Sequence, residues 1–427
     1  MPRHGDVWSA TRARASAMVM VAGLVALGTA SCNAGGSTPS GTPGGTVSSS
    51  RPSMPTPAFS ASPSLTPTPA PSITLAPTAT PGHGTFTVAG PMVSSIAGLA
   101  SVTLLKDGRV LIAGGIGDNH VPLSSAEVFD PKTGTFTASG VMSTGRWVHT
   151  ATLLADGRVL IAGGEGVHAA SLASAEIYDP ATGQFSLTGS MSGPRIGGMT
   201  ATLLADGRVL VVGGNYGITL NPRASAEIYD PATGQFSPTG SMLAVANGAT
   251  ATPLAGGRVL FIGGMDHSGA YLSSAELYDP STGQFAMTGS MAHARFNDTA
   301  TLLADGRVLV AGGMADTGHV VASTEVYDPS SGKFTPTGSM SQAREFHTAT
   351  LLADGRVLVA GGDNNDVGLA STEIYDPSSG KFTPTGSMPA PRDAISAARL
   401  ADGRVMFVGG SDFGANAASP WVYLYNP

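Results

Sequence analysis

The chain has 427 residues and a formal net charge of −7, and only 12% of its residues are charged. Its 58 glycines and 30 prolines favour tight turns and short strands over long solvated helices. A mildly acidic surface repels phosphate backbones, so the composition argues against general nucleic-acid binding. A single cysteine, Cys32, excludes an internal disulfide, so stability must come from packing and from the way the chain closes.

Residues 1–32 have the pattern of an export signal. A basic start that includes Arg12 and Arg14 is followed by an apolar run from Ala17 to Ala30 and by small residues up to Cys32. The run is short for a transmembrane span. The segment Thr29-Ala30-Ser31-Cys32 resembles a bacterial lipobox, although that family usually has Leu at the position of Thr29. The resemblance implies lipidation of Cys32 and attachment to the extracellular face of the cell membrane; ordinary secretion is the alternative.

Residues 33–83 are dominated by Ser, Thr, Pro, Gly and Ala. Such a stretch cannot bury enough apolar surface to offset the entropy lost on ordering. Its prolines keep it partly extended. We therefore expect a disordered tether that holds a folded domain away from the membrane.

From residue 84 onward the chain repeats. The marker is an apolar run that ends in Gly-Gly, and successive copies are 48 to 50 residues apart. The seven glycine pairs are at 114–115, 163–164, 213–214, 263–264, 312–313, 361–362 and 409–410. Seven units at this period indicate a propeller or a solenoid.

One unit illustrates the predicted elements. Strands are expected over 150–154, 159–163, 175–178 and 184–188, with tight turns at Asp156-Gly157 and at Asp179-Pro180. Four short strands per fifty residues is the composition of one propeller blade. A helical solenoid is a weak alternative, because the Gly-Gly pairs and Asp-Pro-x-x-Gly turns interrupt every helical window.

The repeat resembles the kelch motif, in which Gly-Gly is followed by a Tyr and then by another aromatic residue. Here the pair is exemplified by Tyr178 and Phe185; many kelch repeats have Trp at the second position. The resemblance covers residues 84–427 and implies an all-β, seven-bladed kelch-type β-propeller with four antiparallel strands per blade. It says little about the ligand, because kelch propellers serve many unrelated roles.

The two ends of the repeat region complement each other. Residues 85–92 resemble the fourth strand of a unit, whereas the chain stops at 421–427 after a segment that resembles a third strand. We therefore expect the N-terminal strand to complete the last blade, which closes the ring and satisfies both strand edges.

Binding residues are expected where the blades differ, because loops on a rigid scaffold carry most binding sites. By strand parity, the loops after Gly-Gly and the segments linking one blade to the next share a face. The candidate ligand-binding residues are Arg146, Trp147, His149, Arg195, Arg295, Asp298, Arg344, His347 and Arg392 in the linking segments and Tyr216 and His267 in the loops. The other candidates are Asp118, Asn119, His120, His168, Arg223, Asp266, Tyr271, His319, Asp363, Asn364, Asn365, Asp366, Asp412 and Phe413 in the loops and Asn297, Glu345 and Asp393 in the linking segments.

The five candidate arginines occupy matching positions, each four residues after a Met; Ile96 and Ala246 fill that position in the other units. Two orientations remain open. Arginines pointing to the central mouth would attract carboxylate or sulfate groups, and arginines pointing outward would only solvate the rim.

Residues that recur in nearly every unit are interpreted as architecture. The strand glutamates are expected to accept hydrogen bonds between blades; they are Glu127, Glu176, Glu227, Glu276, Glu325 and Glu373. The hairpin arginines are expected to pack between blades, a basic ring for anions being the alternative; they are Arg109, Arg158, Arg208, Arg258, Arg307, Arg356 and Arg404.

Some kelch propellers are enzymes, and galactose oxidase-like members use copper with a tyrosine cross-linked to a cysteine. The repeats of this chain contain no cysteine and no H-x-x-x-H pair, so we expect no cofactor and no metal. The run Asp363-Asn364-Asn365-Asp366 offers oxygen ligands for calcium, but it lacks the Gly and Glu of an EF-hand, and a polar turn is the alternative.

The sequence thus favours a non-enzymatic binding or scaffold module, monomeric and displayed at the cell envelope, with a protein or glycan as its partner. The alternative is a carbohydrate-active enzyme of mutarotase or lyase type, with its site among the loops of one face.

Overall fold

The computed structural model describes residues 84–427 except 97, 118–120, 216–221, 317 and 411–418. The predicted export signal and tether, Cys32 and Tyr216 lie outside the described residues. Within the described part of the chain, no helix has the length and hydrophobicity needed to span a membrane.

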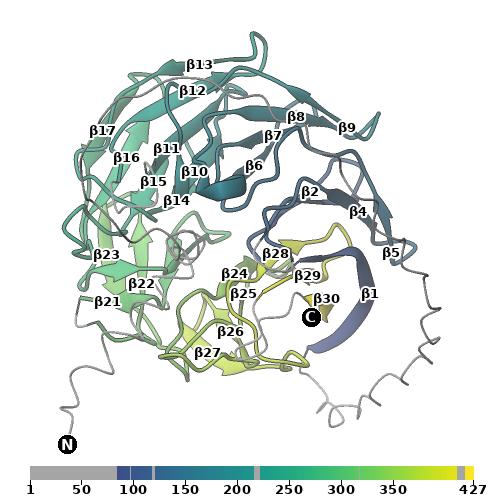
Figure 1. Cartoon of the computed structure of the whole chain (residues 1–427). Helices are drawn as coiled ribbons and strands as arrows, with labels where there is room; N and C mark the ends of the chain where they lie inside the picture. Colours follow the sequence, from purple (N-terminus) through teal and green to yellow (C-terminus); the bar gives the residue numbers. More distant parts are fainter. Residues whose placement is uncertain (1–83, 97, 118–120, 216–221, 317, 411–418) are drawn as a thin grey trace, which may run out of the picture. The chain divides into compact units, whose positions relative to one another are not determined.

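The described residues form seven four-stranded antiparallel sheets, the blades of a propeller (Figure 1). Blade 1 is β2 (Ser101–Leu104), β3 (Val110–Ala113), β4 (Ala126–Asp130) and β5 (Thr135–Ala138). Blade 2 is β6 (Thr150–Leu153), β7 (Val159–Ala162), β8 (Ala175–Asp179) and β9 (Gln184–Leu187). Blade 3 is β10 (Ile196–Leu203), β11 (Val209–Asn215), β12 (Ala226–Asp230) and β13 (Gln235–Pro238). Blade 4 is β14 (Thr250–Pro253), β15 (Val259–Ile262), β16 (Ala275–Asp279) and β17 (Gln284–Met287).

The remaining blades repeat the pattern. Blade 5 is β19 (Thr299–Leu302), β20 (Val308–Ala311), β22 (Thr324–Asp328) and β23 (Lys333–Pro336). Blade 6 is β24 (Thr348–Leu351), β25 (Val357–Ala360), β26 (Thr372–Asp376) and β27 (Lys381–Pro384). Blade 7 is β28 (Ser396–Arg399), β29 (Val405–Val408), β30 (Ser419–Asn426) and β1 (Thr85–Ile96). A short pair, β18 (Arg295–Phe296) with β21 (Met314–Ala315), and a 3-10 turn, η3 (Val167–Ala169), complete the described elements.

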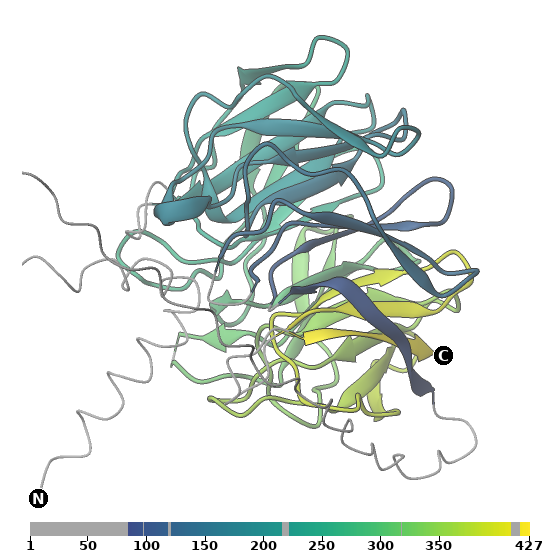
Figure 2. The ribbon, with the colours of Figure 1, turned by 45° about the vertical axis from the view of Figure 1, so that its right-hand side comes forward.

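The first strands of the blades form a closed circle. Each touches the first strand of the blade before and after it, and β28 of blade 7 returns to β2 of blade 1. The last blade contains both ends of the domain: β1 pairs antiparallel with β30, with Thr85 opposite Asn426. Figures 1 and 2 show β1 alongside the C-terminal strand. The predicted seven-bladed kelch architecture and its closure by the N-terminal strand are confirmed.

The hydrophobic core consists of layers between adjacent blades. The second strand of every blade is apolar and fully buried, as in Val159-Leu160-Ile161-Ala162. Leu111 and Val128 of blade 1, for example, share a cluster with Val159 and Ile161 of blade 2. Each fully buried aliphatic side chain contributes about 1.5–3 kcal/mol, so stability comes from stacking one blade on the next.

In blades 2 to 7 a tyrosine hydroxyl also contacts the preceding blade at the outer strands. The Tyr229 ring packs on Phe236 at a centroid distance of 4.9 Å, and its hydroxyl meets Thr188 Oγ1 of the preceding blade at 2.9 Å. Nearby, Gly189 N–H donates to Gly234 O at 2.8 Å. A Cβ at Gly189 would lie 2.3 Å from that oxygen, so the close approach of the two blades requires glycine.

Candidate functional site

Strand connections alternate between two faces of the propeller. The loop face carries the loops after Gly-Gly and the segments that link successive blades; the turn face carries the Asp-Gly-Arg and Asp-Pro turns. Isolated antiparallel bridges join linking segment to loop on the loop face, as between Trp147 and Glu165 and between Glu345 and Asp363. This agrees with the expectation from strand parity that these two connections share a face.

Four of the candidate arginines are buried structural residues. Arg146, Arg195, Arg295 and Arg344 are 0% exposed. Arg146 Nη1 donates to Gly163 O at 2.9 Å and to Ser174 O at 3.1 Å, while Nη2 meets Glu176 Oε1 at 2.9 Å. The other three repeat this arrangement in their own blades. The expectation that they face a ligand is wrong, because the guanidinium groups bind carbonyls at the end of the second strand and a buried glutamate. Arg392 is also buried, at 5% exposure.

The buried strand glutamates bind the linking segments. Glu176 Oε2 accepts the backbone N–H of Ser143 at 2.8 Å, in the segment that leads into its blade. Glu276 accepts the N–H of Leu243 and Ala244 at 2.8 and 2.6 Å although no arginine faces it, since Ala246 occupies that position. The carboxylate thus has the architectural role of hydrogen-bond acceptor that its recurrence predicts.

Two candidate histidines connect neighbouring blades. His149 Nε2 lies 3.0 Å from Ser101 Oγ, and His347 Nε2 lies 3.0 Å from Thr299 Oγ1. Burial, together with the adjacent arginine, lowers the pKa of both to about 3, so both imidazoles are neutral at physiological pH. They hold blades together rather than presenting a proton or a metal ligand to solvent.

Asp298 occupies the same position in blade 5 but does not make the equivalent bond. It is 7% exposed, and neither carboxylate oxygen has a hydrogen-bond partner among the described residues. Thr250 Oγ1, which stands where Ser101 and Thr299 stand, also lacks a partner there. Burial raises the pKa of Asp298 to about 7, an effect that Arg295 opposes. The shorter aspartate thus leaves a polar gap between blades 4 and 5.

Trp147 is 2% exposed and therefore offers no aromatic surface to a ligand. Its indole hydrogen-bonds to Glu165, which opposes the rise that burial causes in the pKa of that carboxyl. His267 is exposed in the loop between β15 and β16 and remains a candidate for contact with a partner.

Three candidate carboxyl groups gather on the loop face at blades 6 and 7. Glu345, Asp363 and Asp393 are 2–3% exposed, and Asn297 Nδ2 donates to Glu345 Oε2 at 2.9 Å. Burial, together with the neighbouring carboxylates, raises the pKa of Glu345 to about 7 and that of Asp363 to about 6. Such groups can hold a proton near neutral pH, which general acid–base chemistry requires. No group of three His, Cys, Asp or Glu side chains among the described residues is placed to hold a metal ion.

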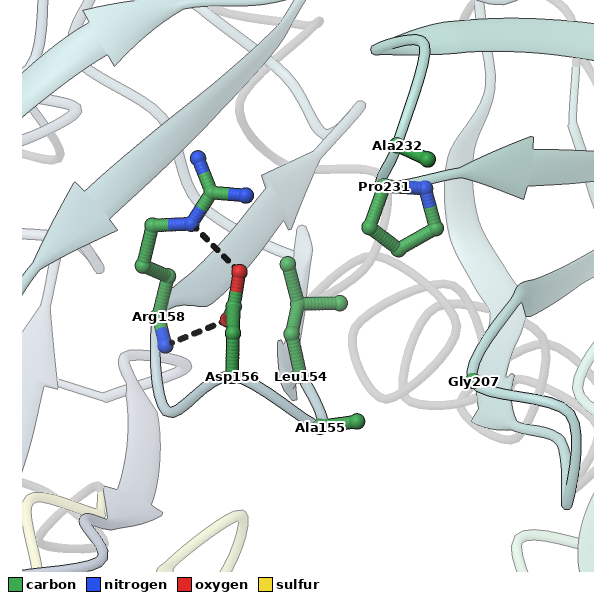
Figure 3. Close-up of a pocket in the computed structure, with 7 residues that line it drawn as sticks. All are labelled: Leu154, Ala155, Asp156, Arg158, Gly207, Pro231 and Ala232. Atoms are coloured by element: carbon green, nitrogen blue, oxygen red, sulfur yellow. Dashed lines mark hydrogen bonds and ion pairs between the residues drawn. The ribbon is translucent and has the colours of Figure 1, made fainter.

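Two hollows lie on the turn face. One, of about 420 Å³, lies between blades 2 and 3 and is lined by Leu154, Ala155, Asp156, Arg158, Gly207, Pro231 and Ala232 (Figure 3). A second, of about 390 Å³, lies between blades 5 and 6. Six of the seven hairpin arginines bind the aspartate of their own turn, as Arg158 binds Asp156 at 2.7 Å. Arg109 and Arg404 also reach a carbonyl of the next blade, at 3.3 and 3.0 Å.

Comparisons with known proteins agree with this architecture. The model of the kelch motif matches residues 103–139, 198–243, 250–292, 295–341 and 347–389, about half of the chain. No curated protein sequence matches significantly. One similar solved structure is a novel fungal alcohol oxidase of the AA5 family in complex with copper; it is 18% identical, with a TM-score of 0.66 over 81% of this chain and 76% of that chain. At this identity the likeness concerns the fold alone. The repeats, the blades and the motif matches together show that this chain belongs to the kelch-repeat β-propeller family.

Proposed function

We propose that this propeller is a non-enzymatic binding module that contacts a protein partner through its loop face. The observation that carries the proposal is the distribution of exposed apolar side chains. Of the nine large hydrophobic residues exposed in the described chain, five lie in loop-face connections: Val121, Val141, Val167, Leu243 and Val367. The other four are on the outer strands β1, β9 and β17, and the turn face has none among the described residues.

The chemistry of this face favours a protein over a glycan. Val121 and Val367 are 50% and 62% exposed at the loops of blades 1 and 6, and aliphatic contacts are typical of protein interfaces. Trp147, the aromatic candidate among the described linking segments, is buried and so cannot stack on a sugar. Four arginines that would have suited acidic sugars are bound inside the blades.

The test uses the full-length protein and two sets of surface variants. Val121→Asp with Val367→Asp charges the loop face, and Leu187→Asp is the matched control on the outer strand β9. We expect pull-downs from the cell envelope to recover a partner with wild type and with the control but not with the loop-face variant. Equal recovery by all three would contradict the proposal. Saturable binding on a glycan array would replace the protein partner with a glycan.

Attachment to the outside of the cell is part of the same proposal. It rests on the basic, apolar and small-residue order of residues 1–32 and on Cys32 at the end of that segment. Replacing Cys32 by Ser should move the protein from the membrane fraction to the medium and abolish labelling by a fatty-acid analogue. Retention of the variant in the membrane fraction would exclude the lipid anchor.

A carbohydrate-active enzyme is the second candidate, because the carboxyls of Glu345 and Asp363 have pKa values raised toward neutrality. The copper chemistry of the similar oxidase is not proposed, since residues 84–427 contain no cysteine and the described residues offer no three-residue metal site. Sugar turnover that is lost in Glu345→Gln and in Asp363→Asn, while both variants keep the wild-type melting temperature, would favour the enzyme over the binding module.

A further inference from the structure

The turn between the first and second strand has the same chemistry in six blades. An aspartate two residues before the arginine accepts the arginine's backbone N–H through Oδ1 at 2.9–3.1 Å and its Nε–H through Oδ2 at 2.7–2.9 Å. Figure 3 shows both bonds between Asp156 and Arg158. In six turns, therefore, one carboxylate is bound by the same backbone N–H and guanidinium group.

Blade 4 keeps the arginine but not the aspartate. Its turn reads Ala255-Gly256-Gly257-Arg258, so Gly256 stands where the other blades have Asp. The frame next to Arg258 is preserved: Leu254 N–H donates to Arg258 O at 2.8 Å, and Gly257 has a φ of +85°, against +86° to +96° at the equivalent glycines. The turn differs one residue earlier, because Gly256 has a φ of +88° and none of the six equivalent aspartates has a positive φ.

No described carboxylate replaces the missing one. Arg258 is exposed, and its side chain and backbone N–H make no hydrogen bond or ion pair with any described residue. Asp279 is its electrostatic neighbour, but Asp279 Oδ1 already accepts the Ser281 N–H and hydroxyl at 2.9 and 2.6 Å. A Cβ built on Gly256 meets nothing within 4 Å, so the space beside this residue is open.

We propose that the turn of blade 4 is a binding site for the carboxylate of a ligand, which takes the place that Asp occupies in the other six turns. Arg258 supplies the charge and the planar fork, which matches two carboxylate oxygens, and its backbone N–H supplies the third donor. The pair is exposed, so a lone monocarboxylate binds weakly and the site acts as one specific contact within a larger ligand. This site is on the turn face and is separate from the loop face proposed to bind a protein.

Arginine NMR of the full-length protein tests the site with an internal control. The protein is labelled with ¹⁵N-arginine and titrated with acetate, then with chloride at the same ionic strength. We expect saturable movement of the Arg258 amide and Nε signals with acetate only. The six arginines that already hold an aspartate should not move. A response of Arg258 no larger than that of Arg158, or equal with chloride, would overturn the proposal.

Two variants at Gly256 test whether the missing carboxylate is what makes Arg258 able to bind a ligand. Asp is strained at the φ of +88° that Gly256 has, so in Gly256→Asp the turn should take the conformation of the other six. This variant should shift the Arg258 signals toward those of the other hairpin arginines without ligand and abolish the acetate response. Gly256→Ala changes the backbone freedom without adding a carboxylate and should keep the response; if it loses the response as Gly256→Asp does, the missing carboxylate is not the cause. N-acetylaspartate carries a carboxylate on a peptide-like molecule, and a uronic acid glycoside carries one on a sugar. If neither compound shifts the Arg258 signals, the proposed site would also be wrong.

Discussion

Replacing Asp298 by Asn should stabilise the propeller in a pH-dependent manner. The carboxyl is buried between blades 4 and 5 without a hydrogen-bond partner among the described residues, and burial raises its pKa from 3.8 to about 7. At 1.36 kcal/mol per pH unit, this difference corresponds to about 4 kcal/mol of folding free energy.

The sign follows from the proton count in the two states. Below about pH 4 the carboxyl is protonated in both folded and unfolded chains, so ionisation costs nothing. Between about pH 4 and pH 7 the unfolded chain releases the proton while the folded chain keeps it, and stability falls as pH rises. Above about pH 7 the full penalty applies. The amide of the Asp298→Asn variant never ionises, so the advantage of this variant over wild type should grow from near zero at low pH to as much as about 4 kcal/mol at pH 8.

Urea unfolding of wild type and Asp298→Asn at a series of pH values measures this difference, and other buried carboxyls cancel because both proteins contain them. Asp305→Asn is the control. The carboxylate of Asp305 binds Arg307, and this bond lowers the pKa of Asp305. Wild type therefore gains stability from this group as pH rises through the acid range, and Asp305→Asn should become less stable relative to wild type over the same range. An advantage of Asp298→Asn that stays constant with pH would show that Asp298 ionises in the fold without cost.

Three further perturbations address the architecture. Arg344→Ala leaves Glu373 buried without its cation and should lower the free energy of unfolding by about 3–5 kcal/mol, whereas Arg356→Ala in an exposed turn should cost less than about 1 kcal/mol; urea unfolding compares them. Deleting residues 84–92 removes the strand that pairs with β30 and should greatly lower the thermal midpoint, so an unchanged midpoint would disprove closure by this strand. Tyr229→Phe keeps the ring but loses the hydrogen bond to Thr188. We expect the free energy of unfolding, measured by calorimetry, to fall by about 1 kcal/mol.

The fold was predictable because its signals are local and repeated. Gly-Gly pairs, Gly-Arg hairpins and pairs of aromatic residues recur along the units, and the resemblance of residues 85–92 to a fourth strand predicts the closure. Recurrence also assigned the strand glutamates to the architecture.

The site was less predictable, because side-chain direction depends on which backbone groups the fold leaves unpaired. The recurrence of Arg146 and its equivalents was compatible with a ligand-facing ring, yet the carbonyls at Gly163 and Ser174 take up the guanidinium. Glu345 and Asp363 are partners in an isolated β-bridge. The equivalent bridge of blade 2 joins Trp147 to Glu165, so no recurring sequence pattern predicts that two carboxyl groups meet in blade 6.

The composite seventh blade has a consequence for how the chain can be rearranged. Thr85 and Asn426 face each other as partners in one ladder, so a short linker could join the two ends of the domain. New ends could then be opened in the segment between β5 and β6. Every blade of such a circular permutant would consist of four consecutive strands. Folding would then no longer require β1 and β30 to pair across the whole length of the domain.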